Sequence, residues 1–153
     1  MDARFDYTQA SPGVYAAMLG LERHLATCAI ERPLLHLVKL RASQMNGCAY
    51  CVDMHWKDLG AIGESDERRY MLSAWRESPL YSSRERAALA WTEVVTTLAD
   101  AIPDAAYAAV RAEFDETGVA DLTCAIVTIN AWNRLAIAAR AVPGLYQPEE
   151  RHA

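Results

Sequence analysis

Two cysteines and a histidine stand close together in the sequence, at spacings that suit redox chemistry. Cys48 and Cys51 are three positions apart, and His55 follows Cys51 by four. On a helix, residues at these spacings share one face, so both thiols and the imidazole can approach contact. A thiol pair can form a reversible disulfide, and an imidazole can hold or release a proton near neutral pH. The spacing therefore predicts a thiol–disulfide redox centre that could reduce a peroxide.

The position of Cys48 matters as much as the spacing. Asn46-Gly47 is a turn signal, and it predicts that a new helix opens at Cys48. Unpaired backbone N–H groups and the positive end of the helix dipole favour a thiolate at such a place. The thiolate is the form that attacks a peroxide or a disulfide. From the residues alone, Cys48 is therefore the more acidic of the two thiols.

Zinc binding is one alternative for the same residues. Two cysteines at this spacing and a histidine supply three ligands of the types that zinc takes. A structural zinc ion usually takes its fourth ligand from a second cluster, and the sequence contains no such cluster. Three scattered residues could contribute that ligand, although their spacing does not point to them: His24, Cys28 and Asp53.

A purely structural role is the other alternative. Buried cysteines often act as small core residues, and a nearby histidine could bond to a backbone carbonyl. This interpretation suits Cys28 and Cys124, which lie among aliphatic residues. It does not explain why Cys48 opens a helix in line with His55. Covalent haem attachment is excluded because Val52, rather than a histidine, follows the second cysteine.

The composition bounds the class of protein that carries this motif. The chain has 153 residues, 52% of them hydrophobic and 23% charged, which fits one globular domain over residues 1–153. Its net charge of −5 argues against nucleic acid or an anionic membrane as a partner. No run approaches the ~20 apolar residues of a membrane span, and charged residues at positions 2, 4 and 6 interrupt any signal-peptide core. We expect a cytoplasmic protein with reduced cysteines.

The pattern of apolar residues predicts an all-α fold. Alternating runs rich in Val, Ile and Thr, which are typical of strands, are missing. Apolar spacing, together with Pro, Gly and turn signals, places the first helices at about Pro12 to Cys28, Pro33 to Met45, Cys48 to Leu59 and Ser65 to Trp75.

The second half of the chain continues in the same way. Ser82 and Glu85 have the spacing of a capping box at the start of a further helix. Pro103 begins another helix, which we expect Gly118 to close. The last helix, from about residue 121 to 140, is apolar nearly all round and should lie deep in the fold or at a subunit interface. This surplus of apolar residues favours a homo-oligomer.

At the level of whole segments, the sequence resembles the AhpD-like alkylhydroperoxidases of the carboxymuconolactone decarboxylase superfamily. The run from Leu37 to His55, within a core motif at residues 34–60, carries the resemblance, and segments 85–93 and 129–134 support it. The resemblance implies a single-domain helical bundle that assembles as a trimer or hexamer. It also implies reduction of a small hydroperoxide without a metal or organic cofactor. Because no Gly-x-Gly-x-x-Gly is present to bind a nicotinamide or flavin, turnover would need an external dithiol reductant.

The resemblance also implies roles for the residues of the motif. In the family, the second cysteine attacks the peroxide, the first resolves the sulfenic acid, and the histidine relays protons. Carried over, Cys51 is the attacking thiol, Cys48 closes the disulfide, and His55 moves the proton. This order differs from the acidity argument for Cys48, and we follow the family because His55 is one turn from Cys51.

One position departs from the family pattern. The best-known members carry a relay glutamate twelve positions before the first cysteine, where this chain has His36. A histidine there could still move protons, or it could be a satisfied core residue. Glu85 and Glu93 are two further candidates for the missing acid. Glu85 has an explanation as the partner in the capping box, so Glu93, whose carboxylate would need a partner if buried, ranks ahead of it.

Two other functions fit the same fold. One is a lyase of the decarboxylase branch, whose chemistry depends on polar and basic groups, and the presence of both Cys48 and Cys51 weighs against it. The other is a non-catalytic redox sensor or binding protein, in which the geometry of the motif would be the same. The sequence favours a thiol-dependent peroxidase and leaves the sensor open.

Overall fold

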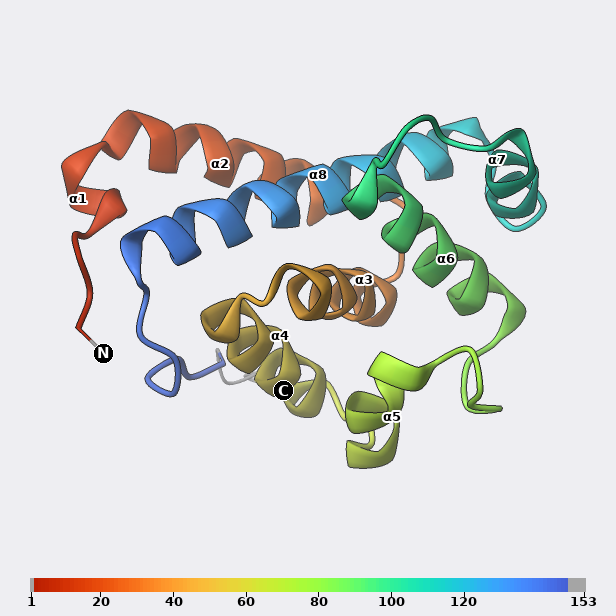
Figure 1. Cartoon of the computed structure of the whole chain (residues 1–153), viewed down its shortest axis with the longest axis horizontal. Coiled ribbons are helices and arrows are strands. Elements are labelled where there is room, and N and C mark those ends of the chain that lie inside the picture. Colours follow the sequence, from red (N-terminus) through yellow and green to blue (C-terminus); the bar gives the residue numbers. More distant parts are fainter. Residues whose placement is uncertain (1, 149–153) are drawn as a thin grey trace.

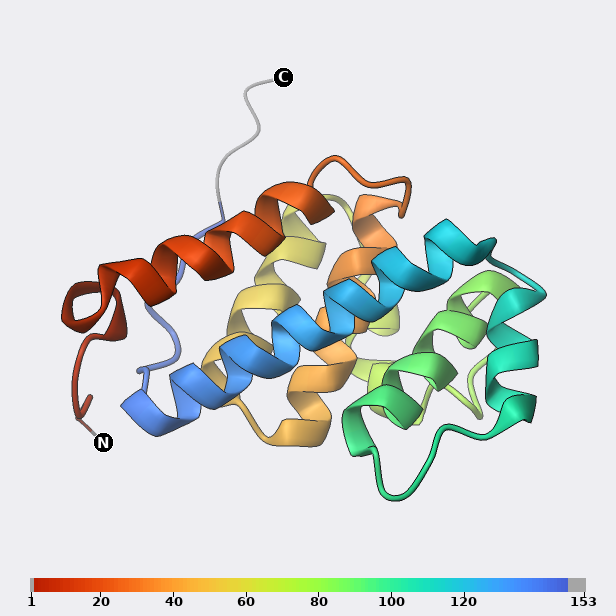
Figure 2. The same ribbon diagram turned by 90° about the horizontal axis from the view of Figure 1, so that it is seen from above.

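The computed structural model describes residues 2–148, and every regular element in this part of the chain is helical. The predicted all-α class is therefore confirmed. Helices α2 (Pro12–Leu25) and α8 (Glu116–Ala139) lie side by side, and α8 crosses over α3 (Arg32–Asn46), as Figures 1 and 2 show from two directions. Helix α4 (Ala49–Ala61) packs on the other side of α3.

The turn between α3 and α4 places the cysteine motif. Gly47 has a φ of +68°, a left-handed conformation that glycine adopts without the Cβ penalty of other residues. The N–H groups of Gly47 and Cys48 bond to carbonyl oxygens in the last turn of α3. Helix α3 therefore ends here, and Cys48 becomes the N-cap residue of α4. The predicted turn and the predicted helix start are both confirmed.

Helix α8 is a core helix on one of its faces. Leu122 and Ile126 are fully buried where the helix packs on α2 and α3. Elsewhere on the surface of the helix, Val127 and Ile137 remain about half exposed. By length and composition, α8 is the one helix in the described part of the chain that could cross a membrane, a test that core helices of soluble proteins also pass. The prediction that this helix lies deep in the fold therefore holds for one of its faces.

The predicted capping box opens α6 (Ser83–Thr97). The Ser82 hydroxyl oxygen accepts from the Glu85 N–H at 3.3 Å, and the Glu85 carboxylate accepts from the Ser82 N–H at 2.8 Å. Two N–H groups at the start of the helix are thereby satisfied. The prediction from the sequence is confirmed.

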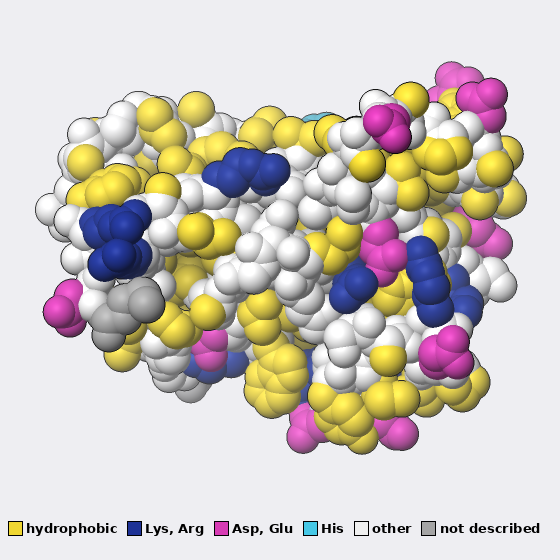
Figure 3. Space-filling view, in the orientation of Figure 1, with side chains coloured by type: hydrophobic (Ala, Val, Ile, Leu, Met, Phe, Trp, Pro, Cys, Tyr) yellow, Lys and Arg dark blue, Asp and Glu magenta, His cyan; other side chains and the backbone are white. Residues whose placement is uncertain are grey.

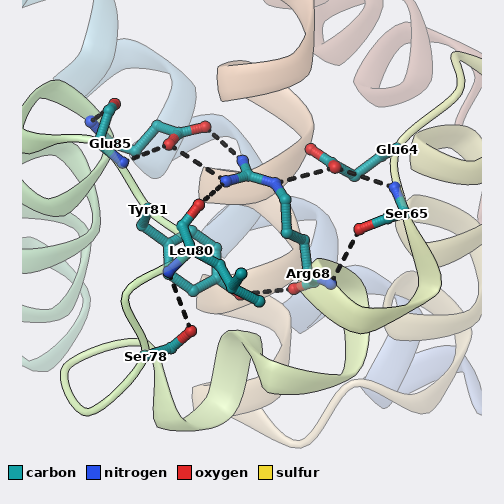
Figure 4. Close-up of polar contacts among 8 residues, drawn as sticks. Glu64, Ser65, Arg68, Ser78, Leu80, Tyr81 and Glu85 are labelled. Atoms are coloured by element: carbon teal, nitrogen blue, oxygen red, sulfur yellow. Dashed lines mark hydrogen bonds and ion pairs between the residues drawn. The ribbon is translucent and has the colours of Figure 1, made fainter.

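Arg68 ties the short helix α5 (Asp66–Met71) to the segment that leads into α6, as Figure 4 shows. Its guanidinium donates to Glu64 at 2.9 Å and to Glu85 at 2.5 Å, and it also donates to the carbonyl oxygen of Leu80. The Glu85 carboxylate is therefore held by both the capping box and this arginine, away from the cysteine motif.

The helix expected to run from Pro103 to Gly118 is in fact two helices. Helix α7 (Asp104–Arg111) stops early, and Asp115 caps the start of α8 by accepting from the Gly118 N–H at 2.7 Å. Gly118 lies in the first turn of α8, so the prediction that it closes the preceding helix was wrong. A glycine ends a helix by adopting positive φ; Gly118 does not, and the carboxylate cap begins a helix instead.

Other boundaries differ by a few residues, as helix ends commonly do. Helix α2 stops at Leu25 rather than near Cys28. The helix expected at Ser65 to Trp75 divides into α5 and a 3₁₀ turn over Leu72–Ala74. The four-residue helix α1 (Tyr7–Ala10) was not predicted, because a single turn leaves too few positions for a periodic pattern.

Replacing Asp115 by alanine should lower the free energy of unfolding by about 1 kcal/mol, because the cap of α8 is lost. The matched control is Asp104→Ala, at the first turn of α7, where the cap position is held by Pro103; we expect a change within about 0.5 kcal/mol. Urea unfolding followed by circular dichroism measures both. Equal losses in the two variants would contradict the cap.

Candidate active site

The two thiols of the motif lie against each other at the start of α4. The sulfur atoms of Cys48 and Cys51 are 2.8 Å apart, and the two side chains are only 1% and 2% exposed. Ala42 of α3 and Ile129 of α8 belong to the same buried cluster. The predicted alignment on one helix face is present, and the sulfurs are within reach of disulfide formation.

The surroundings shift the pKa values of the two thiols in opposite directions. A hydrogen bond shared with Cys51 lowers the pKa of Cys48 to about 7, although burial opposes this shift. Hydrogen bonding to Cys48 and burial raise the pKa of Cys51 above its ordinary value. Asn133 of α8, which is fully buried, acts on both thiols in the direction of a lower pKa. Near pH 7 the negative charge of the pair therefore lies mainly on Cys48.

Asn133 is positioned by two residues near the end of α3. Its side-chain N–H donates to the Ser43 hydroxyl at 3.0 Å, and its carbonyl oxygen accepts from the Asn46 amide at 2.8 Å. Asn133 is a site residue that the sequence did not single out. The available signal was an asparagine inside an apolar helix, since a buried amide always needs partners.

His55 lies one turn beyond Cys51 and is buried between Asp58 and His36. Its Nδ1 is 3.3 Å from Asp58 Oδ2, and Nδ1 of His36, on α3, is 3.6 Å from the same oxygen. The centroids of the two imidazole rings are 5.7 Å apart. Burial lowers the pKa of both histidines, that of His36 to about 4 with a contribution from the neighbouring imidazole. Both imidazoles are therefore uncharged at neutral pH.

The C-terminal segment reaches the same carboxylate. The Tyr146 hydroxyl donates to Asp58 Oδ1 at 2.7 Å. Lys57 of α4 holds this segment by donating to the carbonyl oxygens of Gly144 and Tyr146, at 3.3 and 3.0 Å. Burial favours a raised pKa for Asp58, but contacts with an imidazole and with Tyr146 outweigh it and hold the pKa below its usual value. The carboxylate is therefore ionised.

A cavity of about 280 Å³ opens beside the motif. Among the described residues, Cys51 belongs to its lining and Cys48 does not. Aromatic side chains from α1, α2 and α8 form much of the facing wall, namely Tyr7, Tyr15 and Trp132. A ligand in this cavity therefore meets the sulfur of Cys51 and the imidazole of His55.

The sequence matches a known family over more than half of its length. The carboxymuconolactone decarboxylase family matches residues 12–94. The uncharacterized protein YdfG of Bacillus subtilis is 40% identical over 139 residues, which cover 90% of this chain and 95% of that protein. The chain belongs to the carboxymuconolactone decarboxylase family.

Solved structures agree with this membership. A protein of unknown function from Agrobacterium tumefaciens, suggested to be the antioxidant defence protein AhpD, is 40% identical, with a TM-score of 0.90 over 95% of this chain and 100% of that one. The debrominase Bmp8 is 19% identical, with a TM-score of 0.81 over 90% of this chain and 75% of its own, and it shares the fold. The AhpD-like resemblance of the motif is thereby confirmed.

Glu22 supplies a second carboxylate to the cavity wall, and the sequence did not single it out. Glu22 of α2 pairs with Lys39 at 2.5 Å and accepts from the Trp132 indole N–H at 3.0 Å. Glu22 and Trp132 are 110 positions apart, and only the packing of α2 on α8 joins them. No local pattern could have revealed this contact.

The two glutamates considered for the family's relay acid lie elsewhere. Glu93 of α6 accepts from Arg41 and from the Trp75 indole N–H, at 2.8 Å each, and pairs with Arg76 at 2.7 Å. Glu85 is held as described above. Among the described residues that line the cavity, neither glutamate is present. The structure thus brings together four of the five predicted site residues and leaves Glu93 apart.

The residues considered as a fourth zinc ligand have partners of their own. His24 pairs with Asp121 at 2.7 Å, and Asp53 pairs with Lys57 at 3.0 Å. The thiol of Cys28 donates to a backbone carbonyl within its own turn. Within the described part of the chain, the two thiols of the motif belong to no cluster of three or more metal-binding side chains.

The thiolate absorbance in the ultraviolet should rise with a midpoint near pH 7, because Cys48 is protonated below its pKa and ionised above it. Cys48→Ser should abolish this step, and Asn133→Ala should move the midpoint to higher pH by removing a hydrogen bond. Cys28→Ser is the control and should leave the midpoint unchanged. A first midpoint at the free-cysteine value of ~8.5 in the native chain would contradict the geometry.

Proposed function

We propose that this protein is a thiol-dependent peroxidase that reduces alkyl hydroperoxides to alcohols. The observation that carries the proposal is the position of Cys51, which is in contact with Cys48 on one side and lines an aromatic-walled cavity on the other. Membership of the family and the likeness to a protein suggested to be AhpD support it.

In the first step, the Cys51 sulfur attacks the terminal oxygen of the hydroperoxide. The O–O bond breaks, the sulfur is oxidised to a sulfenic acid, and the alkoxide is the leaving group. His55, which is uncharged at neutral pH, accepts the proton of the Cys51 thiol and returns it to the alkoxide. One thiol and one hydroperoxide thus give one sulfenic acid and one alcohol.

Cys48 completes the second step. Its thiolate attacks the Cys51 sulfur, the disulfide forms, and the departing hydroxide takes up a proton to become water. An external dithiol then exchanges with the disulfide, returns both cysteines to thiols and is itself oxidised to a disulfide.

Acidity and access favour different cysteines for the attack. Cys48 has the lower pKa, but Cys51 faces the cavity. A peroxide must touch the sulfur that it oxidises, so access decides, and Cys51 takes the attacking role. The ready thiolate of Cys48 suits the resolving role, in which the electrophile is the neighbouring sulfur.

Asp58 and His36 complete the proton path, and His36 stands where the best-known family members carry a relay glutamate. The ionised carboxylate of Asp58, whose Oδ2 is 3.3 Å away, favours a proton on Nδ1 of His55 through its charge, which leaves Nε2 to accept from Cys51. His36 faces the same oxygen and connects the carboxylate to a second cavity that it lines. Glu93 takes no part in this path.

We also propose that the subunit assembles as a trimer or hexamer in the cytoplasm. Figure 3 shows hydrophobic side chains gathered at the surface over and around α5. Large apolar side chains with high exposure in the single chain include Tyr70, Leu98 and Leu145. Covering such side chains favours association.

Peroxide consumption with a dithiol donor should be lost in Cys51→Ser, because the sulfur that is oxidised is missing. Cys48→Ser should stop turnover after one equivalent, with the sulfenic acid of Cys51 trapped by dimedone and detected by mass spectrometry. Cys124→Ser, which alters a thiol outside the motif, is the matched control and should retain full activity.

The same assay separates the alternative functions. A disulfide that forms in oxidant but turns over far more slowly than a peroxidase would favour a redox sensor. Activity on a lactone acid that survives alkylation of both motif thiols would favour the decarboxylase-branch lyase. Unchanged peroxide turnover in Cys51→Ser would overturn the proposed mechanism.

Removing the proton path should slow the thiol step by about 10²–10⁴-fold, the usual contribution of a general base. We expect His55→Gln to show this loss in kcat, and Asp58→Asn to show a smaller one together with an altered pH profile. Glu93→Gln is the control that separates the two candidate acids, and its turnover should stay within about twofold of the native value. Stopped-flow peroxide reduction across pH measures all three, and a larger loss in the Glu93 variant would reverse the assignment.

A further inference from the structure

Three donor atoms from two adjacent helices converge beside the thiol pair. They are Nδ1 of His36, Nδ1 of His55 and Oδ2 of Asp58. The oxygen is 3.6 Å from the first nitrogen and 3.3 Å from the second, and one ligand atom from each residue lies within 4.8 Å of the others. Because α3 and α4 pack closely, both backbones hold these side chains in place.

The three groups do not satisfy one another. Both Nδ1 atoms and the Nε2 of His55 are buried and lack a hydrogen-bond partner among the described residues. Although both imidazoles face the oxygen of Asp58, neither contact has the geometry of a hydrogen bond. A buried polar atom without a partner destabilises the fold. Buried imidazole nitrogens without partners thus face one carboxylate oxygen, and a shared ligand could satisfy them.

We propose that His36, His55 and Asp58 form a binding site for a divalent transition-metal ion of the zinc class. Imidazole nitrogen and carboxylate oxygen bind zinc at about 2.0–2.2 Å. In a tetrahedron with such bonds, neighbouring ligands stand about 3.3–3.6 Å apart. The separations of 3.3 and 3.6 Å around Asp58 Oδ2 match that edge length. The three residues supply three corners, and the fourth faces the cavity, whose wall all three residues share.

The surroundings fit such an ion. The Tyr146 hydroxyl binds the other oxygen of Asp58 at 2.7 Å and fixes the carboxylate, as partners of metal ligands commonly do. A metal takes the unprotonated imidazole, and burial lowers the pKa of both histidines. Lys39, a cation in the cavity wall, is paired with Glu22, so its charge is offset.

This site differs from the zinc site that the sequence left open, because it uses no sulfur. It would also regulate the proposed reaction. An ion on Nδ1 of His55 leaves the ring proton on Nε2, so the imidazole no longer accepts the proton of Cys51. The regulatory effect rests on the proposed peroxidase function, whereas metal binding does not. The metal site and the peroxidase function can therefore be disproved independently.

The test measures Zn²⁺ and Co²⁺ binding to the tag-free full chain with both motif thiols replaced, Cys48→Ser with Cys51→Ser. Calorimetry should give one Zn²⁺ per chain, and Co²⁺ should show the intense visible absorption of a tetrahedral site. Added to this background, Asp58→Asn and His36→Ala should each weaken binding by at least about 100-fold, and Tyr146→Phe by about 10-fold. His24→Ala, which removes a histidine outside the cluster, should leave binding unchanged.

Two results would overturn the proposal. One is the absence of a bound ion in the thiol-free background while the native chain binds one, which would move the site to the cysteines. The other is unchanged affinity for Zn²⁺ in both Asp58→Asn and Tyr146→Phe, two near-isosteric changes whose folding circular dichroism can check. Peroxide turnover with and without Zn²⁺ then tests the regulatory consequence in the native chain.

Discussion

The left-handed turn at Gly47 is the constraint on which the site depends. It ends α3 and starts α4 within two residues, so the two helices pack along each other. His36 and Asp58 each lie eleven residues from Gly47, one on either side. Residues equidistant from such a turn come to lie opposite each other, which is why a histidine of α3 meets the carboxylate of α4. The same turn puts Cys48 at the N-cap of α4, where the hydrogen bond with Cys51 and the backbone N–H groups of the first turn lower the pKa of its thiol.

The parts of the site that follow local rules could be predicted from the sequence. The spacing of Cys48, Cys51 and His55 fixes their common face once a helix forms, and Asn46-Gly47 marks where that helix starts. Helix periodicity gave the all-α class for the same reason, because each helix carries its own pattern. The wrong prediction at Gly118 also has a local cause. Asp115, three residues earlier, caps the start of α8, so Gly118 lies in the first turn of that helix and does not end the preceding one.

The parts that depend on distant packing could not be predicted. Asn133 reaches the thiols because α8 crosses α3, and Glu22 enters the cavity wall because α2 lies on α8. Asp58 had the right spacing, three positions after His55, yet an acid at that spacing is common on exposed helix faces. Glu93 illustrates the converse, since its partners from α3 and from the segment after α5 satisfy it away from the cavity.

The different roles of the two thiols follow from their burial. Two sulfurs in contact cannot both carry charge at low cost in a site with little water, so ionising one holds the proton on the other. The backbone N–H groups at the start of α4 bond to Cys48 and favour the charge there, which leaves the thiol that faces the cavity protonated. Attack by Cys51 then requires a base that is unprotonated at neutral pH, and the buried imidazole of His55, whose pKa is lowered by burial, meets that need. Near pH 7 the thiol that titrates is therefore Cys48, which does not line the cavity.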